Sequence, residues 1–119
     1  MTGNYEIDCG ALSNILNLSL NFDIVRRDFL VAGRRSSLFF VDGFMKDEIF
    51  ERLLAFLYRT RPEEIDCCAD IREFSYLRLP YVEVAFQSEA DELVTQLLSG
   101  QAVIIIDGFS DAMLVDTRT

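Results

Sequence analysis

The sequence predicts an α/β domain with a mixed sheet of about five strands, helices packed on it and a β-hairpin near each end. Apolar runs of strand length alternate with stretches whose apolar residues recur at helical spacing. Two runs, LFFV and AVIII, are apolar on consecutive residues, as in strands that are covered on both faces. The chain has 119 residues, which fits one soluble domain over residues 1–119.

The first half of the chain predicts a helix, a hairpin and further helices. Residues 8–18 form a short helix capped by Asp8. Two strands flank a bend at residues 32–34, and the return strand, residues 37–41, takes a central place in the sheet. A helix with an apolar stripe covers residues 46–58. Residues 63–79 form one or two short helices.

The second half predicts a strand, a helix and a closing hairpin. The strand covers residues 80–87, and Ser88 then caps a helix that Gly100 stops. The apolar face of this helix consists of Leu93, Val94, Leu97 and Leu98. The run QAVIIID, residues 101–107, is a buried central strand, and residues 112–118 return beside it as an antiparallel neighbour.

Composition and charge exclude several classes of function. The formal charge of −9 disfavours nucleic acid and anionic lipid as partners. The chain has no histidine, and adjacent Cys67 and Cys68 with a distant Cys9 lack the spacing of a zinc site, so we expect no metal and no cofactor. The odd cysteine count favours a reducing cytosol. The longest apolar run is too short to cross a bilayer.

The tripeptide Asp-Gly-Phe follows an apolar strand twice, at Asp42-Gly43 and at Asp107-Gly108. A pair of catalytic carboxylates would need the two aspartates a few ångström apart. The structural interpretation does not require the two aspartates to be close together, because Asp and Gly accept turn geometry wherever a buried strand ends. We favour strand ends and expect no enzymatic activity. A small-molecule site at Asp42, Gly43, Asp107 and Gly108 stays as the alternative, since α/β sheets often bind ligands at strand ends.

Four arginines gather around the first predicted hairpin, namely Arg26, Arg27, Arg34 and Arg35. A cluster of this kind usually forms a solvated rim. Its other interpretation is a contact surface for an acidic partner, where opposite charge gives specificity. These residues are therefore the interface candidates.

Two stretches resemble the A subunit of bacterial spore germinant receptors, the GerA-type family. The first is DIVRRDFLVAGRRSSLFFVDGFMKDEIFERLL, an arginine-containing strand, a glycine turn and an apolar strand that lead into an acidic helix. The second, ELVTQLLSGQAVIIIDGFSDAMLVDTR, is the more distinctive. The resemblance runs from about residue 11 to the last residue and is vague over residues 60–80. A stage V sporulation protein of the same broad family fits these stretches equally well.

The resemblance implies a first N-terminal subdomain on the cytoplasmic side of the spore inner membrane, attached to a larger membrane protein. The implied partners are the second N-terminal subdomain and the membrane domain of the parent chain, sister A subunits, and the B and C receptor subunits. The implied function is non-enzymatic: subunit assembly, and coupling of nutrient sensing to ion release during spore germination. The alternative function is a nutrient-binding sensor.

Overall fold

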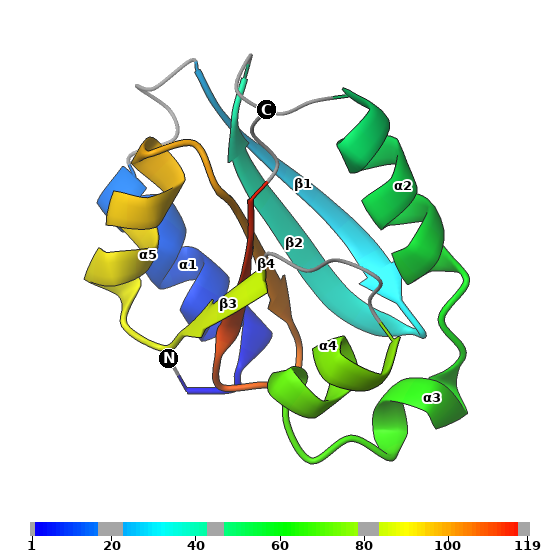
Figure 1. Ribbon diagram of the computed structural model, residues 1–119. Helices are drawn as coiled ribbons and strands as arrows, with labels where there is room; N and C mark the ends of the chain where they lie inside the picture. The colour runs from blue at the N-terminus through cyan, green and yellow to red at the C-terminus, as the bar shows by residue number, and fades with distance from the viewer. Residues whose placement is uncertain (1, 17–22, 43–46, 79–83, 117–119) are drawn as a thin grey trace.

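The structure is a computed structural model that describes residues 2–16, 23–42, 47–78 and 84–116. Its elements follow in the order α1 (Tyr5–Leu16), β1 (Ile24–Val31), β2 (Arg34–Val41), α2 (Asp47–Tyr58), α3 (Pro62–Asp66), α4 (Ile71–Arg78), β3 (Val84–Gln87), α5 (Ala90–Leu98), β4 (Ala102–Ile106) and β5 (Ala112–Val115). Helices cover both faces of one twisted sheet (Figure 1). The α/β class, the strands and the hairpin near each end agree with the sequence.

The sheet has the strand order β1-β2-β4-β5-β3, and every neighbouring pair is antiparallel. The sequence predicted a mixed sheet, because a helix between two strands usually joins parallel neighbours. Strands β3 and β4, joined by α5, do run in the same direction, since each pairs with β5 in the opposite direction. The last strand of the chain inserts between them, so no two parallel strands become neighbours.

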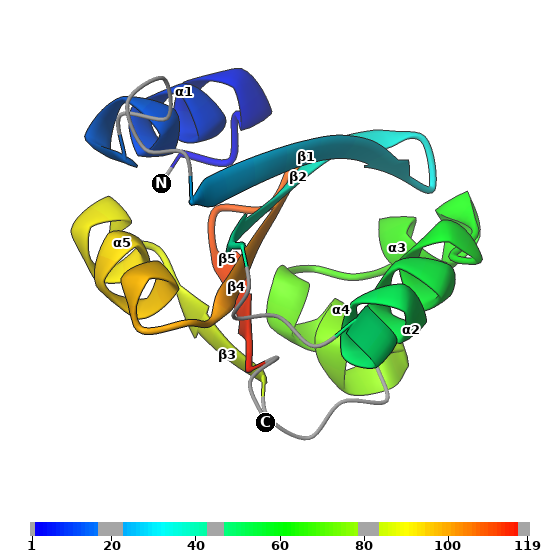
Figure 2. The ribbon, with the colours of Figure 1, turned by 90° about the horizontal axis from the view of Figure 1, so that it is seen from above.

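Two hydrophobic cores lie on the two faces of the sheet. Figure 2 shows α1 and α5 on one side and α2, α3 and α4 on the other. Strand β4 is buried along its whole length, with Ile104 in the α2–α4 core and Ile105 in the α1–α5 core. In strand β2, Leu38 likewise belongs to the α2–α4 core and Phe39 to the α1–α5 core. The central, doubly covered positions expected for both runs are confirmed.

The first helix begins earlier than the sequence predicted. Asn4 caps it, because the Asn4 Oδ1 atom accepts a hydrogen bond from the Ile7 N–H at 3.2 Å. Asp8 lies inside the helix and is only 4 % exposed. Its carboxylate accepts bonds from the Thr2 N–H at 2.9 Å, the Thr2 hydroxyl at 3.0 Å and the Gly3 N–H at 3.1 Å. Asp8 therefore holds the N-terminal residues against the helix and does not cap it.

Two further elements differ in detail from expectation. The N-cap of α5 is Glu89 and not Ser88, and Leu98, expected on the apolar face, is exposed. Residues 63–79, expected to form one or two short helices, contribute to two, α3 and α4, and both helices take part in the α2–α4 core. Part of the strand predicted at residues 80–87 falls outside the described residues, and β3 covers Val84–Gln87.

Candidate functional site

The second Asp-Gly-Phe sequence is a tight turn between β4 and β5. The Phe109 N–H donates to the Ile106 carbonyl at 3.2 Å, and Gly108 has a φ of +93°. A β-turn with positive φ at its third residue strongly favours glycine there. Phe109 folds back into the α2–α4 core. This is the arrangement expected of a strand end.

The Asp107 carboxylate serves the fold. Its Oδ1 atom accepts a hydrogen bond from the N–H of Tyr5, the first residue of α1, at 3.3 Å. The Gly108 N–H donates to the Gly3 carbonyl at 3.1 Å, so the turn also holds the residues before the helix. A negative charge at a helix N-terminus is favourable because of the helix dipole. The turn therefore joins α1 to the end of β4.

Two of the candidate arginines lie beside this turn and anchor opposite helix layers. Arg34 donates to the Asp107 carbonyl at 3.2 Å and to the Asp66 carboxylate at 2.9 Å, and its guanidinium lies 5.1 Å from the centre of the Phe109 ring. Arg35 donates to the Glu6 carboxylate at 2.6 Å. That bond raises the pKa of Arg35 above its ordinary value. Arg34 thus ties β2 to α3, and Arg35 ties it to α1.

Arg26 belongs to a polar network between β1 and α1. Its Nε donates to the Asp28 carboxylate at 2.8 Å and its Nη1 to the Ser13 hydroxyl at 3.0 Å. The buried Ser37 hydroxyl donates its hydrogen to the Asp28 carboxylate at 2.7 Å. The Tyr5 hydroxyl lies 2.6 Å from Ser37 Oγ, and because the Ser37 hydrogen is already engaged, Tyr5 is the donor in the Tyr5–Ser37 bond. Sequence reasoning missed Tyr5 and Ser37, because nothing in their local pattern shows that they meet.

Opposing effects set the ionisation of this network. Burial alone would raise the pKa of Asp28, but hydrogen bonds from Ser37 and Arg26 outweigh it and the pKa is lowered. Burial would likewise lower the pKa of Arg26, yet its bonds to Asp28 and Tyr5 leave it raised. Burial raises the pKa of the neighbouring Cys9 thiol, and a hydrogen bond with Ser37 only partly opposes this. The network is therefore a charged pair within the fold, beside a thiol that resists ionisation.

The remaining candidates lie elsewhere. Arg27 is exposed on β1. Asp42 is exposed at the far end of β2, where its N–H donates to the Asp23 carbonyl at 2.6 Å. Because the Asp107 N–H donates to the Arg35 carbonyl and Asp42 lies seven residues further along β2, the two aspartates are about 23 Å apart. They do not form a joint site. Gly43 lies outside the described residues.

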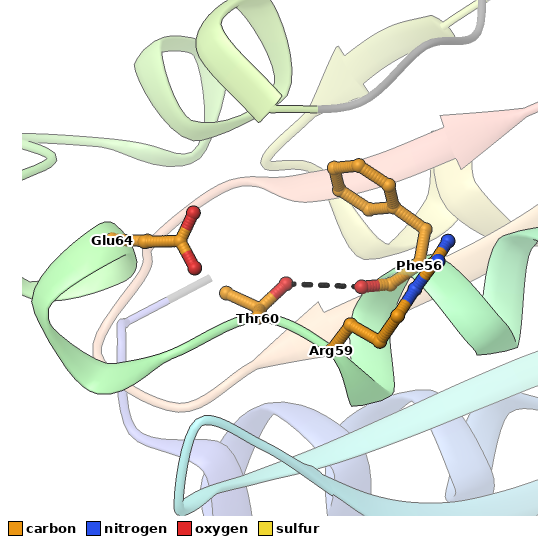
Figure 3. Close-up of a pocket in the computed structure, with 4 residues that line it drawn as sticks. All are labelled: Phe56, Arg59, Thr60 and Glu64. Atoms are coloured by element: carbon orange, nitrogen blue, oxygen red, sulfur yellow. Dashed lines mark hydrogen bonds between the residues drawn. The ribbon is translucent and has the colours of Figure 1, made fainter.

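A pocket of about 170 Å³ opens between the end of α2 and α3, lined by Phe56, Arg59, Thr60 and Glu64 (Figure 3). The Thr60 hydroxyl donates to the Phe56 carbonyl at 3.2 Å, and Arg59 Nε donates to the Ala55 carbonyl at 3.2 Å. Glu64 Oε1 accepts from the Arg61 N–H at 3.0 Å. The lining offers a ring, a cation and an anion, but no nucleophile paired with a base.

The described residues show no other arrangement typical of a chemical site. Among them, no three acidic or cysteine side chains gather as the ligands of a metal ion would. Within the same ranges, no helix is both long and apolar enough to cross a membrane. What the site residues do together is structural: they join the β1–β2 hairpin, the Asp107 turn and the first turn of α1.

Comparison with known proteins gives a family. The family described as "Bacillus/Clostridium GerA spore germination protein" matches residues 11–119. Among solved structures, the chain is similar to the crystal structure of the N-terminal domain of the A subunit of the Bacillus megaterium spore germinant receptor GerK3. The TM-score is 0.70 at 14 % sequence identity, over 99 % of this chain and 95 % of that chain, which shows a shared fold. No curated protein matches the chain. The resemblance seen in the sequence is confirmed: the chain belongs to the GerA spore germination family.

Proposed function

We propose that this chain is a non-enzymatic domain of a spore germinant receptor A subunit, which takes part in subunit assembly and in coupling nutrient sensing to ion release. Family membership over residues 11–119 carries the proposal. The likeness in fold to an A-subunit N-terminal domain supports it. So does the arrangement of the candidate residues: Asp107, Arg26, Arg34 and Arg35 all bind groups of their own chain. A rigid module held in this way suits the transmission of a shift between proteins.

The proposal includes a place for the domain in the cell. The domain is the first N-terminal subdomain of a larger membrane protein and lies on the cytoplasmic side of the spore inner membrane. Its partners are the second N-terminal subdomain, the membrane domain, sister A subunits, and the B and C subunits. The related stage V sporulation protein of the same family remains the other candidate for the parent chain.

A nutrient sensor is the second candidate function, and one observation favours it. The pocket at Phe56, Arg59, Thr60 and Glu64 offers both a cation and an anion, as a zwitterionic or polar small molecule requires. The two Asp-Gly sequences are less suitable as a small-molecule site. The Asp107 carboxylate accepts a bond from Tyr5, and Asp42 lies about 23 Å away along β2.

The test of the assembly proposal is a deletion of residues 2–116 from the full-length protein in spores of the source organism. We expect less A, B and C subunit in the inner-membrane fraction, and no nutrient-triggered ion release. A germination stimulus that bypasses the receptor serves as the control and should still act. Receptor that assembles fully and responds to nutrients without these residues would contradict the proposal.

A further inference from the structure

The net charge of the chain lies on one part of the fold. Residues 26–78 carry ten acidic and ten basic residues, whereas residues 1–25 and 79–119 carry ten acidic residues and a single arginine, Arg118. The whole formal charge of −9 therefore belongs to the second group. That group includes α1, α5 and strands β3, β4 and β5. A single layer of helices, α1 and α5, contains no lysine or arginine.

Helices α1 and α5 contact each other and run in the same direction. Helix α1 begins beside Asp107 at the end of β4, and α5 ends just before β4 starts. In α1, Glu6 and Ser13 each follow a buried residue and reach arginines of the β1–β2 hairpin. Because α5 runs parallel to α1 on the same face of the sheet, a residue of α5 that follows a buried residue has the same orientation. It therefore points toward β1, which is the side on which α1 lies.

This geometry brings two exposed apolar side chains to the seam between the helices. Leu98 follows the buried Leu97, so it points from α5 toward α1, and it is 56 % exposed. Ile15 precedes the buried Leu16, so it points from α1 toward α5, and it is 47 % exposed. Both lie in the last turn of their helix. Ile7 is also exposed, in the first turn of α1 and about 12 Å along the helix axis from Ile15.

The exposed acidic groups of α5 lie at its other end, about 9 Å or more along the helix axis from Leu98. Glu89, Asp91 and Glu92 are exposed in and before the first turn of α5, and none of their carboxylates has an ion-pair partner among the described residues. Neither helix has a basic residue in its last turn, so the negative ends of two parallel helix dipoles lie at the same edge. We name the surface formed by Ile7, Ile15, Leu98, Glu89, Asp91 and Glu92 the α1–α5 face.

We propose that the α1–α5 face binds a different protein, through a surface that carries arginine or lysine beside an apolar patch. Protein interfaces combine apolar and charged contacts, and opposite charge fixes the partner and the register. This inference rests on the proposed assembly role, because it names the surface through which a partner subunit attaches.

The charge distribution also indicates which of three partners fits this face: anionic lipid, a second copy of the chain, or a distinct basic protein. Anionic lipid is repelled by the exposed carboxylates of α5, and neither α1 nor α5 has a lysine or arginine of its own. A second copy of the chain would bring its own net charge of −9 to the contact, since its α1–α5 face is equally acidic and residues 26–78 are balanced in charge. Helices α2–α4, on the opposite side of the sheet, all belong to that balanced segment. A distinct protein with an excess of basic residues is the complement that remains.

The experiment uses the full-length protein in intact spores, with a benzophenone amino acid at Leu98. The matched control carries the same photo-reactive residue at Tyr58, which is 53 % exposed at the end of α2. After irradiation, the cross-linked peptide is identified by mass spectrometry. We expect an adduct at Leu98 with a peptide of another protein, containing Lys or Arg beside apolar residues. The Leu98 adduct should exceed the Tyr58 adduct at least about tenfold.

Charge reversal tests the acidic residues of α5. The double variant Asp91→Lys/Glu92→Lys should lower the Leu98 adduct at least about tenfold, because it places like charges against the basic partner. Its control, Glu48→Lys/Glu51→Lys on α2, changes the net charge by the same amount and should leave the adduct unchanged. An equal effect of both variants would overturn the proposal. So would an adduct at Leu98 no stronger than at Tyr58, or one formed with lipid, with a second copy, with a later domain of the parent chain, or with an acidic peptide.

The same spores separate this proposal from the broader function. Nutrient-triggered ion release is measured in the α5 double variant. If the adduct is lost and ion release persists, the face is a real contact but the assembly role in germination fails. If deletion of the domain abolishes ion release but Leu98 forms no adduct, the assembly role stands and the α1–α5 face is the wrong surface.

Discussion

At the scale of single residues, side chains that looked available for chemistry stabilise the fold. Asp107 accepts a bond from the first N–H of α1, and Arg34 and Arg35 connect the neighbouring β2 to helices on opposite faces. The sequence correctly predicted that Asp-Gly ends a strand. It could not show that the carboxylate binds Tyr5, because 102 residues separate the two in the chain.

The two aspartates should differ when each is changed to asparagine. Asp107→Asn removes a negative charge from the N-terminus of α1 but keeps an acceptor, so we expect a loss of about 1 kcal/mol in unfolding free energy. Asp42→Asn is the control and should change it by less than about 0.5 kcal/mol, because that side chain is exposed. Urea unfolding of both variants measures this. Losses of equal size would contradict the role given to Asp107.

Asp28 predicts a specific dependence on pH. Its pKa is lowered in the folded state, so the ionised carboxylate stabilises the fold at neutral pH, and this contribution is lost as pH falls below about 4. The difference in unfolding free energy between the parent chain and Asp28→Asn should therefore shrink between pH 6 and pH 3. Denaturant unfolding at a series of pH values measures it. A difference that stays constant or grows toward low pH would contradict this assignment.

At the scale of elements, periodicity predicted most of the helices and strands, and long-range contacts decided the rest. The stripe of α2 and the continuous apolar run of β4 follow from burial, so the sequence alone shows them. The start of α1 was missed because Asp8 resembles a cap, whereas Asn4 is the residue whose side chain reaches the free N–H. The insertion of β5 between β3 and β4 could not be predicted, since it depends on which strands meet in space.

Two glycines test the local geometry with one chemical change. Gly33 lies in the β1–β2 turn with φ +83°, and Ala32 before it has φ +53°, the pattern of a type I′ hairpin. Gly33→Ala should cost about 1–2 kcal/mol, because a side chain is strained at positive φ. Gly10→Ala, inside α1, should instead stabilise by about 0.5–1 kcal/mol.

In both positions an added Cβ meets nothing within 4 Å, so crowding does not confuse the comparison. Thermal or urea unfolding of the two variants gives the sign directly. Changes of the same sign would show that one of the two backbone conformations is not the one described.

At the scale of the whole molecule, the sheet separates two helix layers with different surface charge. Residues 26–78 supply the α2–α4 layer and are balanced in charge, while α1 and α5 come from segments with almost no basic residues. Composition showed a net charge of −9 but not its distribution over the fold. The arginines that suggested an interface in the sequence are largely engaged within the domain. The contact surface proposed here therefore required the structure.

The central claim is that this domain acts through protein contacts and not by binding a nutrient. An amide NMR titration of the chain with amino acids, sugars and nucleosides at millimolar concentration tests it most directly. We predict no localised, saturable shifts, either at the Asp107 turn or around Phe56, Arg59, Thr60 and Glu64. Saturable shifts confined to one of these places would contradict the claim and make the domain a sensor.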